Sequence, residues 1–228
     1  MIKAIFKWCL VEGKIEKDPF VTYQSTFRAT YGTPVYIDDD EVRQIADCDL
    51  SHNKHLDTQR DIFVFQCSIG CRVGDLFRLK RENIKGRYVE FIAAKTANDR
   101  PQTLRVPLSP KAMELIQKHR SDSDDRLFPF ISQQKYNEAI KEIFKTAGVT
   151  RLVTVKNSKT GKPEQVDISE CASSHMARRT FIGNLYKKVK DQNLVGSLSG
   201  HKEGSRAFAR YRDIDDDIKC DVIDLMGY

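Results

Sequence analysis

The sequence contains no uninterrupted apolar run that approaches the ~18 residues of a membrane-spanning helix. Residues 1–20 mix acidic, basic and apolar side chains at helical spacing, which is unlike a secretory signal peptide. These absences argue against a membrane protein and against export. The six cysteines are accompanied by no export signal, so we expect free thiols in a reducing compartment and a cytoplasmic protein.

Signatures of a bound metal or nucleotide are also missing. The cysteines show no paired zinc-site spacing, and Cys67 and Cys71, one helical turn apart in an apolar segment, are more typical of a core. The pair Gly161-Lys162 is followed by Pro163 and lacks the upstream glycine of a phosphate-binding loop. We therefore expect no metal, no nucleotide and no other cofactor.

Charge is distributed unevenly along the chain. Residues 212–228 carry two basic residues against six aspartates, a net charge of −4, and the whole chain carries +6, so residues 1–211 carry +10. A basic body with a short acidic end suggests a polyanionic partner, most commonly nucleic acid. On charge alone, an ordinary basic protein without such a partner is an equally good interpretation.

Breaks in the sequence pattern divide the chain into three parts. Residues 1–20 hold an apolar stripe at helical spacing, and residues 21–34 are polar and aperiodic, with breakers such as Gly32, which is typical of a linker. The chain is 40% hydrophobic, so residues 35–228 can bury one sizeable core. We therefore expect a short helix, a linker and one main domain.

Helical periodicity dominates the main domain, with two pairs of alternating segments between the helices. Residues 88–92 with those around 104–106, and residues 151–156 with 164–168, predict two antiparallel hairpins. The expected helices cover residues 58–70, 73–77, 110–119 and 132–147, a segment with His175 and Arg178, a short one ending at Gly200, one that carries Tyr211, and a final amphipathic one with Ile218, Val222 and Leu225. The predicted fold class is α+β, mainly α, with a small antiparallel β-sheet.

Six residues at the edges of these elements suit phosphate chemistry, because cationic and imidazole groups grip an anionic phosphate and a phenol can attack it. In chain order they are Arg72, Lys95, His175, Arg178, His201 and Tyr211. His175 and Arg178 are three residues apart and so point from the same face of a helix. Each residue alone also has an ordinary interpretation, such as a solvated arginine, a surface lysine or a helix cap, and Tyr186 and Tyr228 are rivals to Tyr211.

Four segments around these residues resemble the tyrosine site-specific recombinases of the phage-integrase family. They are GCRVGDLFRLKRENI at the first arginine, AAKTANDRPQTLRVPLSP at the lysine, SSHMARRTF at the His-x-x-Arg pair, and SGHKEGSRAFARY up to the tyrosine. SSHMARRTF in particular is similar to integrases of bacterial mobile elements. The interval from His201 to Tyr211 is one residue longer than the commonest family spacing. The resemblance implies a helical catalytic domain over residues 35–228 and the C-terminal end of an N-terminal core-binding domain in residues 1–20.

The resemblance also implies a role for each residue. Tyr211 is the nucleophile and forms a 3′-phosphotyrosine, and Lys95 protonates the departing 5′-oxygen. His175 is an added donor or proton shuttle, and His201 hydrogen-bonds the phosphate.

The two arginines, Arg72 and Arg178, clamp the non-bridging oxygens of the phosphate in this interpretation. Guanidinium groups suit that task because they stay charged and donate in a fixed, bidentate geometry. Asp75, three residues after Arg72, is a candidate partner that orients an arginine.

The implied function is cleavage and rejoining of double-stranded DNA by a site-specific recombinase or integrase that self-associates as a dimer or tetramer on DNA. Two alternatives stay open: a type IB-like DNA topoisomerase, which reseals without exchanging partners, and a catalytically inactive DNA-binding accessory protein. The apolar stripe of the C-terminal tail docks either on a neighbouring protomer or on its own domain, and the sequence favours neither.

Overall fold

The computed structural model describes residues 2–21, 34–94, 103–120, 125–157, 160–201 and residue 223. The chain divides into two compact units, residues 1–32 and residues 33–228. In the described part of the first unit, α1 (Ile2–Val11) has no buried residue, and the side chain of Trp8 is 51% exposed. Phe6 and Phe20 meet edge to face with ring centroids 5.4 Å apart, so the segment after α1 folds back on it. The helix expected within residues 1–20 is confirmed.

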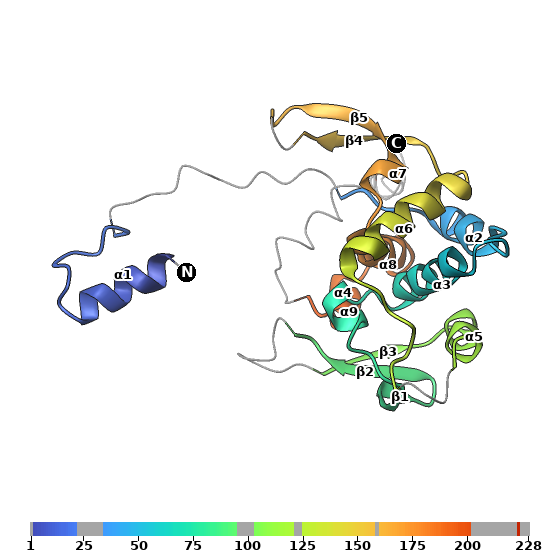
Figure 1. The fold of residues 1–228 in the computed structure, drawn as a ribbon, viewed down its shortest axis with the longest axis horizontal. Helices are drawn as coiled ribbons and strands as arrows, with labels where there is room; N and C mark the ends of the chain where they lie inside the picture. Colours follow the sequence, from blue (N-terminus) through green and yellow to red (C-terminus); the bar gives the residue numbers. More distant parts are fainter. Residues whose placement is uncertain are drawn as a thin grey trace. The chain divides into compact units, whose positions relative to one another are not determined.

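The second unit is mostly helical and carries two small antiparallel sheets (Figure 1), which confirms the predicted fold class. Its helices in the described residues are α2 (Asp39–Asp47), α3 (Lys54–Ile69), α4 (Val73–Leu76), α5 (Pro110–Lys118), α6 (Gln133–Thr146), α7 (Ile168–Cys171), α8 (Ser174–Val189) and α9 (Gln192–Ser199), with a 3-10 turn at Arg81–Asn83. Its strands are β1 (Ile84–Lys85), β2 (Tyr88–Ile92), β3 (Thr103–Pro107), β4 (Leu152–Lys156) and β5 (Pro163–Asp167). None of the helices in the described ranges combines the length and hydropathy needed to cross a lipid bilayer.

Helix α3 forms the centre of the second unit. It is buried on nearly all sides and contacts α2, α5, α6 and α8. Phe63 packs against Phe144 with ring centroids 5.5 Å apart, and Phe65 packs against Phe128 at 4.9 Å. Because most of its residues are buried, α3 needs neighbouring elements on nearly every side. The buried helix expected from residue 58 is confirmed, although it begins one turn earlier, at Lys54.

Gly70 ends α3 in a left-handed conformation, with φ +63°. A Cβ atom at this position would lie only 2.2 Å from Cδ1 of Phe181, so the missing side chain lets α8 approach the end of α3. Cys67 and Cys71 flank this glycine and are 7% and 2% exposed, which confirms that both belong to the core.

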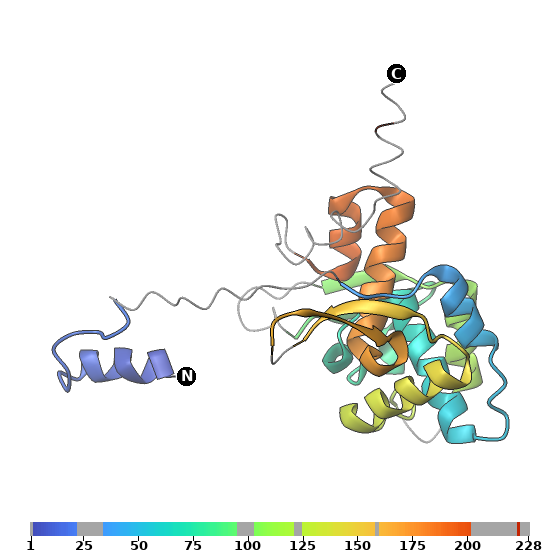
Figure 2. The ribbon, with the colours of Figure 1, turned by 90° about the horizontal axis from the view of Figure 1, so that it is seen from above.

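Both expected hairpins are present. In the sheet β1–β2–β3, Val89 pairs with Val106 and Phe91 with Leu104, and all four side chains are buried. Alternate residues therefore face the core and the solvent, as the sequence pattern predicted. In Figure 1 this sheet and the β4–β5 hairpin lie on opposite sides of the short helices α4 and α9. Strand β3 also contacts α9, and α9 packs beside α8 (Figure 2).

Candidate active site

Arg178 is the residue that joins the elements around the candidate site. It lies on α8 with its side chain turned into the interior, and the residue is 4% exposed. Its Nη1 donates to the backbone carbonyl of Gly70 at 2.7 Å, and its Nη2 donates to the carbonyl of Ser199 at 2.7 Å. These carbonyls stand at the C-terminal ends of α3 and α9, where carbonyls lack helical partners and the helix dipole favours a cation. The local sequence therefore stabilises a charged guanidinium at the meeting point of three helices.

His201 stands directly after α9 and beside Arg178. Gly200 ends the helix with φ +67°, and the backbone N–H of His201 donates to the Gly196 carbonyl at 3.0 Å. The Nη2 atom of Arg178 lies 3.3 Å from His201 Nδ1, and the hydroxyl of Ser199 lies 2.8 Å from the same nitrogen. The structure thus brings together two of the predicted residues, Arg178 and His201, and adds Ser199 to them.

Arg72 and Asp75 lie at the start of α4, next to the carbonyl that Arg178 binds. The Arg72 side chain is 32% exposed, and its Nη1 is 4.0 Å from Oδ2 of Asp75. The Asp75 side chain is 1% exposed and makes closer contacts elsewhere: Arg78 donates to Oδ1 at 2.6 Å, and the backbone N–H of Ala94 donates to the same oxygen at 2.9 Å. Asp75 therefore ties α4 to the residue that immediately precedes Lys95.

Charges from this group of residues act on the pKa of the buried Cys71 thiol. Burial raises the pKa of the Cys71 thiol, and the Asp75 carboxylate raises it further, whereas Arg178 and Arg72 act in the opposite sense. Both arginines and the aspartate are thus close enough to act on a single buried sulfur. The thiol itself stays protonated, so Cys71 contributes packing and no nucleophile.

The other three predicted residues are placed differently or not described. His175 is exposed at the start of α8, whereas Arg178, one turn further on, is buried. Lys95 and Tyr211 lie outside the described residues. The expected helix that carries Tyr211 also lies outside them, as do the three residues named for the final amphipathic helix, Ile218, Val222 and Leu225.

Gln66 is a supporting residue that the sequence reasoning missed. Its side chain is fully buried in α3, donates from Nε2 to the Cys71 carbonyl at 3.1 Å, and accepts from the Tyr136 hydroxyl at 3.1 Å. Burial raises the pKa of Tyr136 far above its usual range, so that hydroxyl keeps its proton and remains a donor. These two hydrogen bonds, from Tyr136 to Gln66 and from Gln66 to the Cys71 carbonyl, hold the turn between α3 and Arg72. The signal that could have found it is a glutamine between Phe65 and Cys67, inside an apolar segment.

A second missed feature is a buried charge network near the other end of α3. Arg60 donates to the carbonyls of Ala46 and Cys48 at 2.9 and 2.7 Å and so caps α2. Burial opposes the charge on Asp61, yet hydrogen bonds from His119, Lys118 and Arg60 outweigh it and lower the pKa of Asp61 to about 2. Asp61 is nine residues from Gly70, about 13 Å along the helix. The network therefore stabilises the domain away from the candidate site.

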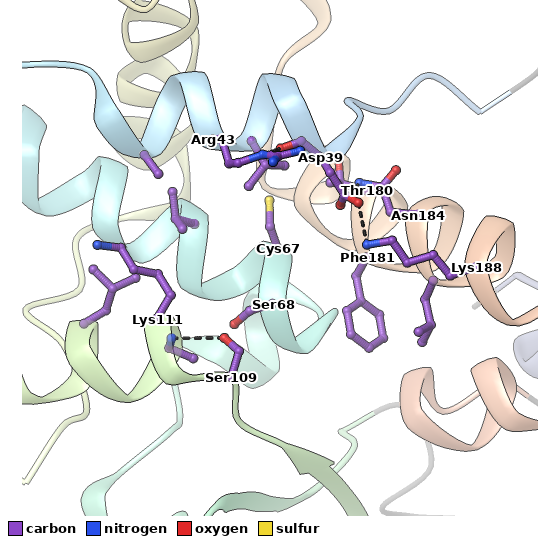
Figure 3. A pocket seen from close by; sticks show the side chains of 16 residues that line it. Asp39, Arg43, Cys67, Ser68, Ser109, Lys111, Thr180, Phe181, Asn184 and Lys188 are labelled. Carbon is purple, nitrogen blue, oxygen red and sulfur yellow. Dashed lines mark hydrogen bonds and ion pairs between the residues drawn. The ribbon is translucent and has the colours of Figure 1, made fainter.

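A cavity of about 670 Å³ opens between α2, α3, α5 and α8 (Figure 3). Its lining is largely apolar and includes Cys67 and Phe181, while an ion pair between Asp39 and Lys188 stands at its exposed edge. None of the candidate residues that the structure describes lines it. Within the same described ranges, no three histidine, cysteine or acidic side chains are grouped as metal ligands would be.

Comparisons with known proteins agree with this architecture. The model of the phage integrase family matches residues 36–217. No curated protein sequence matches the chain. One similar solved structure is XerA recombinase, with a TM-score of 0.60 and 15% sequence identity; the match covers 87% of this chain and 67% of XerA. Another is a lambda integrase dimer bound to a COC′ core site, with a TM-score of 0.63 and 18% identity; the match covers 92% of this chain and 70% of that one. A third is XerH recombinase bound to a difH substrate, with a TM-score of 0.60 and 16% identity; the match covers 86% of this chain and 54% of XerH. The chain therefore spans between about half and somewhat over two thirds of the length of these three proteins.

Proposed function

The chain belongs to the phage integrase family, and we propose on that premise that it cleaves and rejoins DNA strands as a tyrosine site-specific recombinase through a 3′-phosphotyrosine. The observation that carries the proposal is the Arg178 guanidinium, held by the carbonyls of Gly70 and Ser199 beside His201. One buried cation, one imidazole and the Arg72 segment meet there, although they come from three separate parts of the sequence.

The arrangement suits stabilisation of a phosphate transition state. Nucleophilic attack on a phosphodiester increases the negative charge on the non-bridging oxygens, and donors fixed in advance stabilise that charge most effectively. The hydrogen bonds to the Gly70 and Ser199 carbonyls fix the plane of the Arg178 guanidinium. The guanidinium therefore needs no reorganisation during the reaction. Arg72, whose side chain is one-third exposed, supplies the second guanidinium.

The proposed reaction is a reversible transesterification. The Tyr211 phenol loses its proton and its oxygen bonds to phosphorus, while the bond from phosphorus to the 5′-oxygen breaks and Lys95 gives that oxygen a proton. His175 adds a donor or shuttles the phenolic proton. The 3′-phosphotyrosine keeps the phosphodiester energy, so the 5′-hydroxyl of a second strand can restore the backbone without a nucleotide cofactor.

Double-stranded DNA and further copies of the chain are the proposed partners. The charge of +10 on residues 1–211 favours a polyanion. The similar XerH structure is described as bound to a difH substrate, one lambda integrase structure as bound to DNA, and another as a tetramer bound to a Holliday junction. We assign residues 35–228 to the catalytic domain and residues 1–20 to the end of a core-binding domain. The C-terminal tail is proposed to dock on a neighbouring or its own protomer.

A suicide substrate tests the proposal directly. We would incubate the protein with duplexes drawn from the DNA that flanks its gene, each nicked so that the short 5′-ended piece diffuses away after cleavage. A covalent protein–DNA adduct should accumulate, and mass spectrometry should place the DNA on Tyr211. Tyr211→Phe should form no adduct, while Tyr186→Phe serves as the matched control and should behave like the wild type.

Three results would contradict the proposal. An adduct on any other tyrosine would refute the assignment of Tyr211, and no adduct on any flanking sequence would favour the inactive accessory protein. Relaxation of supercoiled plasmid without paired sites would instead identify a topoisomerase.

A further inference from the structure

Ser199 is the last residue of α9, and its hydroxyl has two close hydrogen-bond partners besides a longer contact of 3.5 Å to the Gly196 carbonyl. The residue is 1% exposed, and its Oγ is 2.7 Å from the Val195 carbonyl oxygen and 2.8 Å from Nδ1 of His201. Both distances are those of good hydrogen bonds. A serine hydroxyl has only one proton to donate, although it can also accept. The direction of these two bonds therefore decides where the imidazole proton lies.

Only one of the two possible arrangements satisfies both contacts. If the hydroxyl donated to Nδ1, the oxygens of Ser199 and Val195 would face each other at 2.7 Å with no proton between them, which is repulsive. If the hydroxyl donates to the Val195 carbonyl, as serines in helices commonly do to the residue four positions earlier, its lone pair accepts from Nδ1–H. The hydrogen bonds then run in series, from His201 Nδ1–H to the Ser199 hydroxyl and from that hydroxyl to the Val195 carbonyl.

Arg178 does not require the opposite arrangement. A donor that hydrogen-bonds one ring nitrogen lies along its lone pair and hence much farther from the other nitrogen. The Nη2 atom of Arg178 is instead almost equally far from both nitrogens of His201, at 3.3 and 3.5 Å. Its well-formed bond is the one to the Ser199 carbonyl at 2.7 Å. The guanidinium therefore contacts the ring without being aligned with the Nδ1 lone pair.

We infer that Ser199 is a positioning residue that holds neutral His201 in the tautomer with its proton on Nδ1. The neutral ring then carries its lone pair on Nε2, where it accepts a proton and cannot donate one. A hydrogen bond from Nε2 to a phosphate oxygen, the role that the sequence suggested for His201, consequently requires the charged imidazolium. The catalytic meaning of this inference rests on the proposed function, whereas the tautomer itself does not.

The tautomer can be measured without DNA. In ¹⁵N-labelled protein, long-range ¹H–¹⁵N spectra distinguish a protonated from an unprotonated ring nitrogen, and loss of one ring system in His201→Gln assigns His201 among the five histidines. At a pH where the ring is neutral, we expect Nδ1 to be protonated in the wild type. Ser199→Ala removes the acceptor and should shift the population toward Nε2–H, the form that prevails for histidine in water.

Ser197→Ala is the matched control. Ser197 lies on the same helix and makes the same type of bond, donating to the Leu194 carbonyl at 2.7 Å, but it is exposed. This variant should leave the His201 spectrum unchanged. A wild-type ring protonated on Nε2, or a Ser199→Ala ring that keeps the wild-type tautomer, would overturn the inference. If Ser199→Ala fails to fold, the wild-type spectrum alone decides. Because no DNA is present, a failure of cleavage and a failure of the tautomer assignment are separate results.

Discussion

Replacing Gly70 with alanine tests whether the approach of α8 to α3 builds the candidate site. The added Cβ would lie 2.2 Å from Cδ1 and 2.6 Å from Cγ of Phe181, so the ring cannot stay where it is. Phe181 follows Arg178 by three residues on the same helix, and Arg178 donates to the Gly70 carbonyl itself. The substitution should therefore disturb both the stability of the domain and the position of the guanidinium.

Two physical costs set the size of the effect. Gly70 has φ +63°, and a side chain in this left-handed region costs ~1–2 kcal/mol. Overpacking a filled site costs a further ~1–3 kcal/mol. We therefore expect Gly70→Ala to lower the free energy of unfolding by ~2–5 kcal/mol, which at a urea slope of ~2 kcal/mol/M moves the midpoint by ~1–2.5 M.

Gly86→Ala separates the two costs. Gly86 has a nearly identical φ of +61°, but among the described residues no atom lies within 4 Å of the added Cβ. It should therefore show only the backbone cost of ~1–2 kcal/mol. Urea unfolding followed by circular dichroism, together with the suicide-substrate assay, would compare the two variants. Equal destabilisation, or full adduct formation by Gly70→Ala, would refute the idea that close packing at this glycine positions Arg178.

Two further predictions concern charge. Arg178→Lys replaces a planar fork with a single ammonium group that cannot reach both carbonyls, so we expect trapped adduct to form ~10²–10³-fold more slowly. Adduct formation by the Arg178→Lys variant at the wild-type rate would contradict this. The folded-state pKa of Asp61 is depressed to about 2 from 3.8, so its stabilisation is present above pH 3.8 and is lost as the pH falls through about 2. The shift corresponds to about 2 kcal/mol. Urea unfolding at successive pH values should show this loss in the wild type, and an unchanged acid profile in Asp61→Asn would argue against it.

The sequence by itself determined the local elements and the order of the candidate residues. Helical and alternating spacing predicted α3, the two hairpins and the helix with Arg178, because such patterns depend on neighbours within one or two turns. Gly70 and Gly200 were correctly identified as the ends of helices for the same reason. The motifs also pointed to the phage integrase family, since each motif lies within one short segment.

Tertiary structure decided which of these residues meet and what each one faces. Arg178 and the Gly70 carbonyl are 108 positions apart, and only the packing of α8 against α3 brings them to 2.7 Å. The same packing buries Arg178 while His175, one turn earlier on α8, remains exposed, and their spacing alone does not reveal that difference. The closest partner of Asp75 is Arg78, at 2.6 Å, and Ser199 gained its contact with His201 from the turn at Gly200. Such contacts depend on distances between segments, and a linear pattern carries no information about those distances.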